Sequence, residues 1–121
     1  MPNSVLIVDD AVFMRTMLKD IFKSMGIDVA GEAENGMEAI ELYDALKPQL
    51  ITMDIIMPDM DGITAVKEIL KNDSQAKIIM CSALGQEAFV MESIEAGAKD
   101  FIVKPFTPEE VKEVVSRVLE E

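Results

Sequence analysis

The chain has 121 residues, half of them hydrophobic, and its 11 basic and 23 acidic side chains give a formal charge of −12 at pH 7. These values indicate one globular domain over residues 1–121 and argue against a disordered chain, a membrane span, nucleic acid binding and binding to anionic lipid. The chain contains no histidine, which excludes Ser-His and Cys-His nucleophiles, histidine zinc sites and a phosphohistidine carrier. The single cysteine and the absence of a signal-peptide pattern indicate a cytoplasmic protein.

The first half of the chain alternates between strand and helix patterns. Residues 5–8 form a continuous apolar run, as expected of a parallel strand that is covered on both faces. Hydrophobic residues then recur at helical spacing over residues 14–25, and Gly26 provides a C-terminal stop. Residues 28–33 are less apolar and are expected to form an edge strand, after which the pattern predicts a helix over residues 35–46 that Asn35 caps.

The second half repeats this alternation three times. Strands are expected at residues 50–53, 77–81 and 101–103, and each precedes a helix, over residues 62–72, 86–96 and 107–119. The last helix has the clearest start, because Thr107 and Glu110 form a capping box and Pro108 occupies the first helical position. Five strand-helix units with short connections predict a parallel sheet with right-handed crossovers and helices on both faces.

Polar side chains follow four of the predicted strands. Asp9 and Asp10 follow the first strand, Asp54 the third, Ser82 the fourth and Lys104 the fifth. The carboxyl ends of the strands in an open parallel sheet form one edge, where ligands bind. Three carboxylates at one edge repel one another unless a cation neutralises them, and oxygen ligands without histidine or cysteine favour Mg²⁺.

A magnesium ion beside a lysine and a hydroxyl group is the arrangement that phosphoryl transfer uses. The sequence has no nucleotide-binding loop, because Met37 and Glu38 stand where a Walker-type loop beginning at Gly31 requires Lys and Ser or Thr. One of the chain's own carboxylates is therefore the expected acceptor, since carboxylates form acyl phosphates. The residue types alone leave open which carboxylate it is.

Four motifs, at residues 5–10, 53–62, 81–83 and 104–106, resemble those of the receiver domain of two-component response regulators in order and spacing. The resemblance covers essentially the whole chain, and single-domain chemotaxis regulators are the most similar members. It implies a flavodoxin-like (βα)5 fold with a parallel five-stranded sheet in the order 2-1-3-4-5. It also implies that the protein takes a phosphoryl group from a histidine kinase and then changes its binding to a motility-apparatus or adaptor protein, without acting as a multiple-turnover enzyme.

The resemblance also implies roles for the residues at the strand ends. Asp54 matches the phosphorylated aspartate, and Asp10 matches the carboxylate that binds Mg²⁺ directly. Asp9 matches the carboxylate that acts mainly through the waters of the ion, and the backbone carbonyl of Ile56 matches the third protein ligand. Lys104 matches the lysine that pairs with the phosphoryl group.

Two further positions match the switch of the family. Ser82 matches the hydroxyl that follows the phosphoryl group on activation, and Phe101 occupies the aromatic switch position. The bond between Lys104 and Pro105 is cis in the family. The output surface is expected on the strand that contains Phe101 and on the helices over residues 86–96 and 107–119.

Ile56 and Leu84 depart from the family pattern, because residues at these positions border the path of the hydrolytic water and are often polar. We therefore expect the protein to lose its phosphoryl group slowly, and we expect an external phosphatase among its partners. We also expect the protein to be a monomer.

Two other functions stay open. One is a phosphorelay intermediate that passes the group to a histidine phosphotransfer protein, and the other is a magnesium phosphatase with Asp54 as a transient nucleophile.

Overall fold

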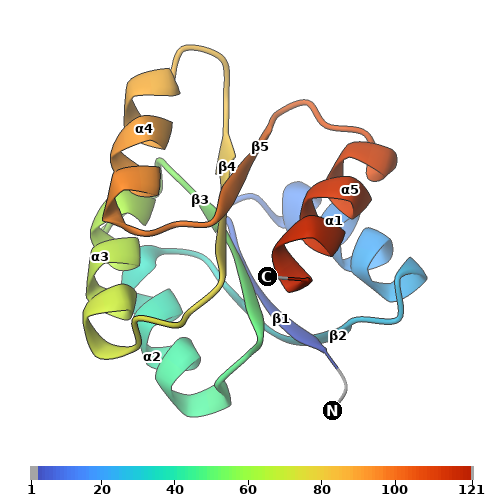
Figure 1. The fold of residues 1–121 in the computed structure, drawn as a ribbon, viewed down its shortest axis with the longest axis horizontal. Coiled ribbons are helices and arrows are strands. Elements are labelled where there is room, and N and C mark those ends of the chain that lie inside the picture. Colours follow the sequence, from blue (N-terminus) through green and yellow to red (C-terminus); the bar gives the residue numbers. More distant parts are fainter. Residues whose placement is uncertain (1–2, 121) are drawn as a thin grey trace.

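The computed structural model, which describes residues 3–120, shows five strands and five helices in strict alternation (Figure 1). The strands are β1 (Ser4–Val8), β2 (Asp28–Ala33), β3 (Leu50–Asp54), β4 (Ile78–Ser82) and β5 (Asp100–Val103). The helices are α1 (Val12–Ser24), α2 (Gly36–Leu46), α3 (Gly62–Asn72), α4 (Glu87–Ala96) and α5 (Pro108–Leu119). All strand pairs are parallel, in the order β2-β1-β3-β4-β5, so the predicted fold class and strand order are confirmed.

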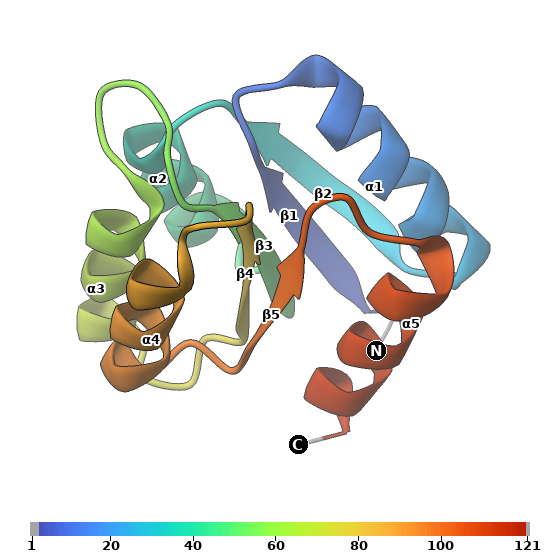
Figure 2. The same ribbon diagram turned by 90° about the horizontal axis from the view of Figure 1, so that it is seen from above.

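The sheet separates two layers of helices (Figure 2). Helices α1 and α5 cover one face, and α2, α3 and α4 cover the other. Ile7 of β1 belongs to the same core as Phe22 and Val115, whereas the neighbouring Leu6 belongs to the core that contains Val66. Burial of both faces explains why the strands are continuous apolar runs, and β2 lies at an edge of the sheet, as its weaker run predicts.

Two of the predicted site residues lie inside strands rather than after them. Asp54 is the last residue of β3 and pairs with Cys81, and Ser82 is the last residue of β4 and pairs with Val103. Strand pairing therefore continues one residue beyond the apolar runs on which the sequence prediction was based. Both side chains still lie at the carboxyl edge of the sheet, so the predicted position of the site is unchanged.

Side-chain caps begin three of the helices. Asn35 accepts a hydrogen bond from the backbone N–H of the third residue of α2 at 2.9 Å, and Thr107 accepts one from the third residue of α5 at 3.2 Å, as the sequence predicts. Asp61 caps α3 in the same way at 2.8 Å. Helix α4 begins one residue later than predicted, because Gln86 has non-helical backbone angles and is its N-cap.

The inward face of α1 contains one residue that the sequence does not predict. Leu18 and Phe22 of the predicted stripe are buried, and Met14 and Met17 pack against the same core while remaining partly exposed. Arg15 is buried as well, on the same side of the helix as Leu18 and Phe22. The arginine is inside because its head group finds hydrogen-bond partners at the carboxyl ends of β1 and β2.

The longest helix, α1, has 13 residues, whereas a helix needs about 20 to cross a membrane. Over residues 3–120, none of the helices has the length and apolar character of a membrane span.

The loop after β3 approaches the backbone of Asp54 closely. The N–H of Gly62 donates to the carbonyl oxygen of Ile55 at 2.7 Å. A β-carbon at position 62 would lie 2.0 Å from the carbonyl oxygen of Asp54. The steric limit on residue 62 is therefore set by the backbone, which cannot move without displacing Asp54.

We expect Gly62→Ala to lower the free energy of unfolding by about 3 kcal/mol, because overpacking against backbone atoms cannot be relieved by a side-chain rotation. Gly31→Ala is the matched control, since the added β-carbon would meet only the flexible end of Leu46. Urea unfolding followed by circular dichroism measures both variants. Equal stability of the two variants would contradict the steric account.

Candidate functional site

The carboxyl edge of the sheet brings three acidic side chains together. Carboxylate oxygens of Asp9, Asp10 and Asp54 lie within 4.8 Å of one another. Asp9 and Asp54 are buried, and Asp10 is exposed. Lys104 reaches the same cluster from the end of β5, although β3 and β4 lie between β1 and β5 in the sheet. The structure therefore assembles four of the residues that the sequence predicts for the site.

Asp9 is held on all sides. Its backbone N–H donates to the carbonyl oxygen of Ala33 at 3.0 Å, and its carbonyl oxygen accepts a hydrogen bond from Arg15 at 2.7 Å. One carboxylate oxygen accepts from the N–H of Ala11 at 2.9 Å, and the other accepts from Lys104 at 2.8 Å. These contacts hold the Asp9 side chain in one position at the base of the cluster.

The surroundings of Asp54 disfavour the ionised form of its carboxyl group. Its carboxylate accepts a hydrogen bond from the N–H of Ile55 at 2.9 Å and lies 3.2 Å from the ammonium group of Lys104. Burial and the charge of Asp9 nevertheless raise the pKa of Asp54, and the contacts with Lys104 and Ile55 offset this only in part. Another cation beside Asp54 would stabilise its ionised form.

Lys104 remains a cation in this setting. Burial lowers its pKa, but the hydrogen bond to Asp9 and the charges of Asp54 and Asp9 outweigh burial, so the pKa of Lys104 is raised. Its backbone N–H donates to the carbonyl oxygen of Ser82 at 2.7 Å, and the bond to Pro105 is cis, as the family resemblance implies. The lysine thus supplies a fixed positive charge next to two carboxylates.

The donor set of the cluster fits a hard divalent cation. Asp9, Asp10 and Asp54 offer only oxygen atoms, and the exposure of Asp10 leaves room for water ligands. The charge balance also favours a cation, because Lys104 is the ammonium group described at these three carboxylates and it contacts Asp9 and Asp54 but not Asp10. The cluster can therefore bind a metal ion.

Ser82 and Phe101 lie on a groove next to the cluster. Their side chains, with those of Ala83, Met91 and Val103, line an apolar cavity of about 230 Å³ between α4 and β5. Ser82 is buried, and Phe101 is 42% exposed. Gln86 accepts a hydrogen bond from the N–H of Ala83 at 2.7 Å, which closes the loop that follows Ser82. Ser82 therefore belongs both to the carboxyl edge and to the wall of the groove.

Ile56 and Leu84 lie on the two loops that border the cluster. Their side chains are 60% and 81% exposed, respectively. The expected barrier to water at these places stays a prediction. The role of the Ile56 carbonyl as a metal ligand stays a prediction.

Cys81 pairs with Asp54 in the sheet, and its thiol is not reactive. It is fully buried in β4, and burial raises the pKa of its thiol to about 12. A protonated, inaccessible thiol behaves as a small hydrophobic side chain.

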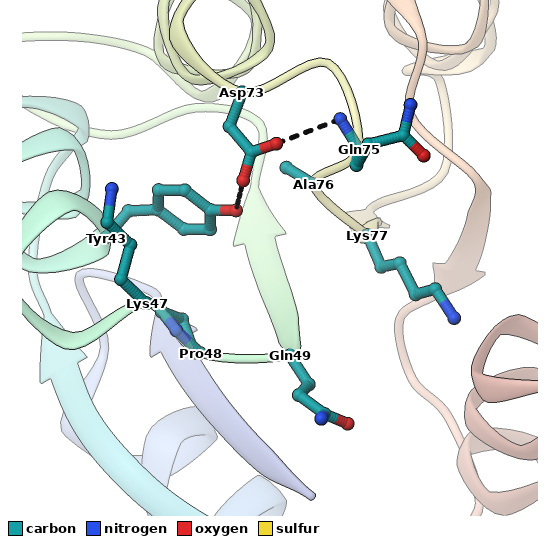
Figure 3. Close-up of a pocket in the computed structure, with 8 residues that line it drawn as sticks. All are labelled: Tyr43, Lys47, Pro48, Gln49, Asp73, Gln75, Ala76 and Lys77. Atoms are coloured by element: carbon teal, nitrogen blue, oxygen red, sulfur yellow. Dashed lines mark hydrogen bonds between the residues drawn. The ribbon is translucent and has the colours of Figure 1, made fainter.

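A polar cavity of about 320 Å³ lies at the opposite edge of the sheet, where the strands begin (Figure 3). Gln49 and Lys77, which line it, directly precede β3 and β4. In Figure 3 the hydroxyl of Tyr43 points toward Asp73, to which it donates a hydrogen bond. This cavity contains one carboxylate rather than three, and its Tyr43–Asp73 contact joins α2 to the end of α3.

Sequence reasoning missed one residue that touches the cluster, Arg15. Its position among the hydrophobic residues of α1 would have signalled it, because Arg15, Leu18 and Phe22 follow helical spacing. Glu32 and Glu34, near the end of β2, are the nearby acidic residues that can pair with a buried arginine.

Comparison with known proteins identifies the relatives of the chain. A family model described as response regulator receiver domain matches residues 5–116. The chain is 63% identical over 118 residues to chemotaxis protein CheY of Thermotoga maritima, with 98% of both proteins covered. It is 57% identical over 119 residues to CheY of Bacillus subtilis, covering 98% of this chain and 99% of that protein. A solved CheX-CheY-BeF3-Mg complex from Borrelia burgdorferi matches with a TM-score of 0.94 and 42% identity, covering 98% of this chain and 90% of that one.

We expect Asp54→Asn to raise the melting temperature of the metal-free protein by a few degrees at pH 7. The substitution removes a carboxylate that burial and Asp9 disfavour, and it keeps an oxygen that can accept from Ile55. The pKa of Asp54 is higher in the folded than in the unfolded state, so the ionised carboxylate destabilises the fold at neutral pH. This destabilisation is lost as the carboxylate becomes protonated in both states. The difference from the wild type should therefore shrink as the pH falls to about 4.

Thermal unfolding in a chelating buffer at several pH values measures this difference. Asp61→Asn is the control, because Asp61 is an exposed helix cap and asparagine caps helices equally well. A variant at position 54 that is no more stable than the wild type at pH 7 would refute the prediction.

Proposed function

The chain belongs to the response regulator receiver family, and on this basis we propose that Asp54 accepts a phosphoryl group from the phosphohistidine of a histidine kinase. The chain is a CheY-like chemotaxis regulator, and we assign residues 1–121 to one receiver domain. The observation that carries the proposal is the position of the Asp54 carboxylate, 3.2 Å from Lys104 and within 4.8 Å of carboxylate oxygens of Asp9 and Asp10.

The residues at the edge of the sheet divide the chemistry among them. The ionised carboxylate of Asp54 attacks phosphorus, the new O–P bond forms as the P–N bond to imidazole breaks, and the imidazole takes a proton from solvent. Lys104 pairs with a phosphoryl oxygen, and the hydroxyl of Ser82 donates to another. Asp54 carries one phosphoryl group per chain, so the protein promotes its own modification and is not a multiple-turnover enzyme.

The metal ion that the cluster can bind is proposed to be Mg²⁺. Asp10, Asp54 and the carbonyl of Ile56 would hold Mg²⁺ directly, and Asp9 would act through its waters; the bound ion would offset the charge of the carboxylates and of the phosphoryl oxygens. The oxygen-only donor set and the exposure of Asp10 support this assignment. The solved relative from Borrelia burgdorferi, whose complex contains Mg²⁺ and BeF3, supports it as well.

The apolar groove between α4 and β5 is the proposed output surface. Ser82 lies between the cluster and this groove, so movement of Ser82 toward a phosphoryl group changes the wall that Phe101 and Met91 complete. Phe101 has no hydroxyl, so its contribution to the switch is a change in how much of its ring is exposed. We propose that the partner that binds there is a motility-apparatus protein. A phosphorelay partner would need contact with the cluster alone, so the apolar groove beside the cluster favours the output function.

Intact mass after incubation with acetyl phosphate tests the proposed reaction. We expect the wild type to gain one phosphoryl group only when Mg²⁺ is present, and we expect no gain in Asp54→Asn. Lys104→Met should also lose the adduct, because it removes the cation that lies 3.2 Å from Asp54. An adduct of equal abundance in Asp54→Asn would disprove the assignment of Asp54.

A phosphatase is a further proposed partner, because Ile56 and Leu84 place aliphatic side chains at the border of the cluster. These side chains hinder the approach of water to the acyl phosphate. The relative that was solved in complex with CheX shows that a CheY protein can bind a second protein in the presence of BeF3 and Mg²⁺. The phosphatase would then remove the phosphoryl group, which this chain loses only slowly by itself.

The double variant Ile56→Asn, Leu84→Glu tests this barrier. We expect it to lose its phosphoryl group about tenfold faster, which corresponds to a barrier about 1.4 kcal/mol lower. Decay is followed by intact mass after removal of the phosphodonor with Mg²⁺ retained. Met37→Gln is the control, because Met37 is an exposed apolar residue of α2, and an unchanged decay rate in the double variant would reject the barrier.

A further inference from the structure

We propose that Arg15 is a positioning residue for the metal ion, because it fixes the peptide group between Asp9 and Asp10. The guanidinium group is bound to the carbonyl oxygen of Asp9, and the nitrogen of that same peptide group belongs to Asp10. Rotation of this peptide group would displace Asp10, which supplies the exposed carboxylate of the cluster. The inference rests on the proposed function, since it concerns the binding of Mg²⁺ at that site.

Arg15 makes three contacts although it is only 7% exposed. Its Nη1 donates to the carbonyl oxygen of Asp9 at 2.7 Å. Its Nε donates to Glu32 at 3.0 Å, and its Nη2 lies 3.7 Å from Glu34. The contact with Asp9 is the shortest of the three, and it is directed at the backbone beside the metal ligands.

The acidic partners make the burial of Arg15 possible. A buried guanidinium group is costly unless it is paired and hydrogen-bonded. Burial raises the pKa of Glu32, but its hydrogen bonds with Lys19 and Arg15 outweigh burial, so this pKa is lowered and Glu32 remains an anion. Arg15 thus connects α1, the end of β2 and the end of β1 through one planar group.

A simple brace between α1 and β2 would not require the contact with Asp9. Lys19 shows this, because it pairs with the same Glu32 at 3.1 Å from the same helix. Arg15 differs from Lys19 in that it also binds the Asp9 carbonyl. The side chain of Asp9 is already fixed by Ala11 and Lys104, so the additional bond acts on the backbone that leads to Asp10.

The direction of the change in Mg²⁺ affinity distinguishes a positioning role of Arg15 from a purely electrostatic one. Removal of a positive charge close to a cation site should strengthen Mg²⁺ binding if charge alone acts. Positioning predicts the opposite for Arg15, because groups that orient metal ligands change metal affinity by about 10- to 100-fold when they are removed. Lys19→Met removes an equal charge without touching Asp9, so it reports the electrostatic effect alone.

Isothermal titration calorimetry with MgCl2 on the unphosphorylated protein measures this affinity. We expect Arg15→Met to bind Mg²⁺ at least about tenfold more weakly than the wild type, and Lys19→Met to bind it equally well or slightly better. We expect Glu32→Gln to keep the bond between Arg15 and Asp9, because the amide oxygen of glutamine can still accept from Arg15 and Glu34 still faces the guanidinium group. It should therefore retain affinity within about threefold even where it lowers the melting temperature.

Two results would overturn the inference. One is equal or tighter Mg²⁺ binding by Arg15→Met, and the other is a loss in Glu32→Gln as large as that in Arg15→Met, which would assign the effect to packing. Circular dichroism at the titration temperature confirms that each variant is folded. If Arg15→Met is not, Arg15→Lys takes its place, because it keeps the charge but lacks the planar group that reaches Asp9 and Glu32 together, and Mg²⁺ binding equal to that of the wild type would overturn the inference. A wild type that binds no Mg²⁺ would instead refute the proposed function itself.

Discussion

The mutual repulsion of three carboxylates at one edge of the sheet is the constraint on which the rest of the site depends. The fold meets it in part with Lys104, which reaches from β5 across β4 to Asp54 and across β4 and β3 to Asp9. One ammonium group is insufficient, because burial and the charge of Asp9 together still raise the pKa of Asp54. A bound cation would supply part of the missing positive charge, and it would also offset the charge of the phosphoryl group that we propose Lys104 contacts.

The surrounding backbone holds these charges in place. Asp9 has partners for its N–H, its carbonyl and both carboxylate oxygens, and Gly62 lets the next loop close against Asp54. Ser82 extends the site to its neighbour, because its carbonyl holds the backbone of Lys104 while its side chain lines the apolar groove. A chemical event at the cluster therefore has a short physical route to a surface that another protein can bind.

Much of this could be predicted from the sequence because the signals are local. Apolar runs and helix caps give the alternation of elements, and the polar residues after the runs give the cluster. Arg15 was missed because its burial depends on Glu32, which lies on another element and comes near only in the folded chain. The extra strand residues at Asp54 and Ser82 were missed for a similar reason, since they depend on pairing with neighbouring strands. The groove at Phe101 likewise required the packing of α4 against β5.

The most direct test of the central claim is to locate the phosphoryl group on the chain. Borohydride reduces an acyl phosphate of aspartate to homoserine, and peptide mass analysis then identifies the modified position. The account predicts homoserine at position 54 after treatment with acetyl phosphate and Mg²⁺, and none when Mg²⁺ is chelated. Homoserine at position 9 or 10, or modification that does not depend on the metal ion, would contradict it.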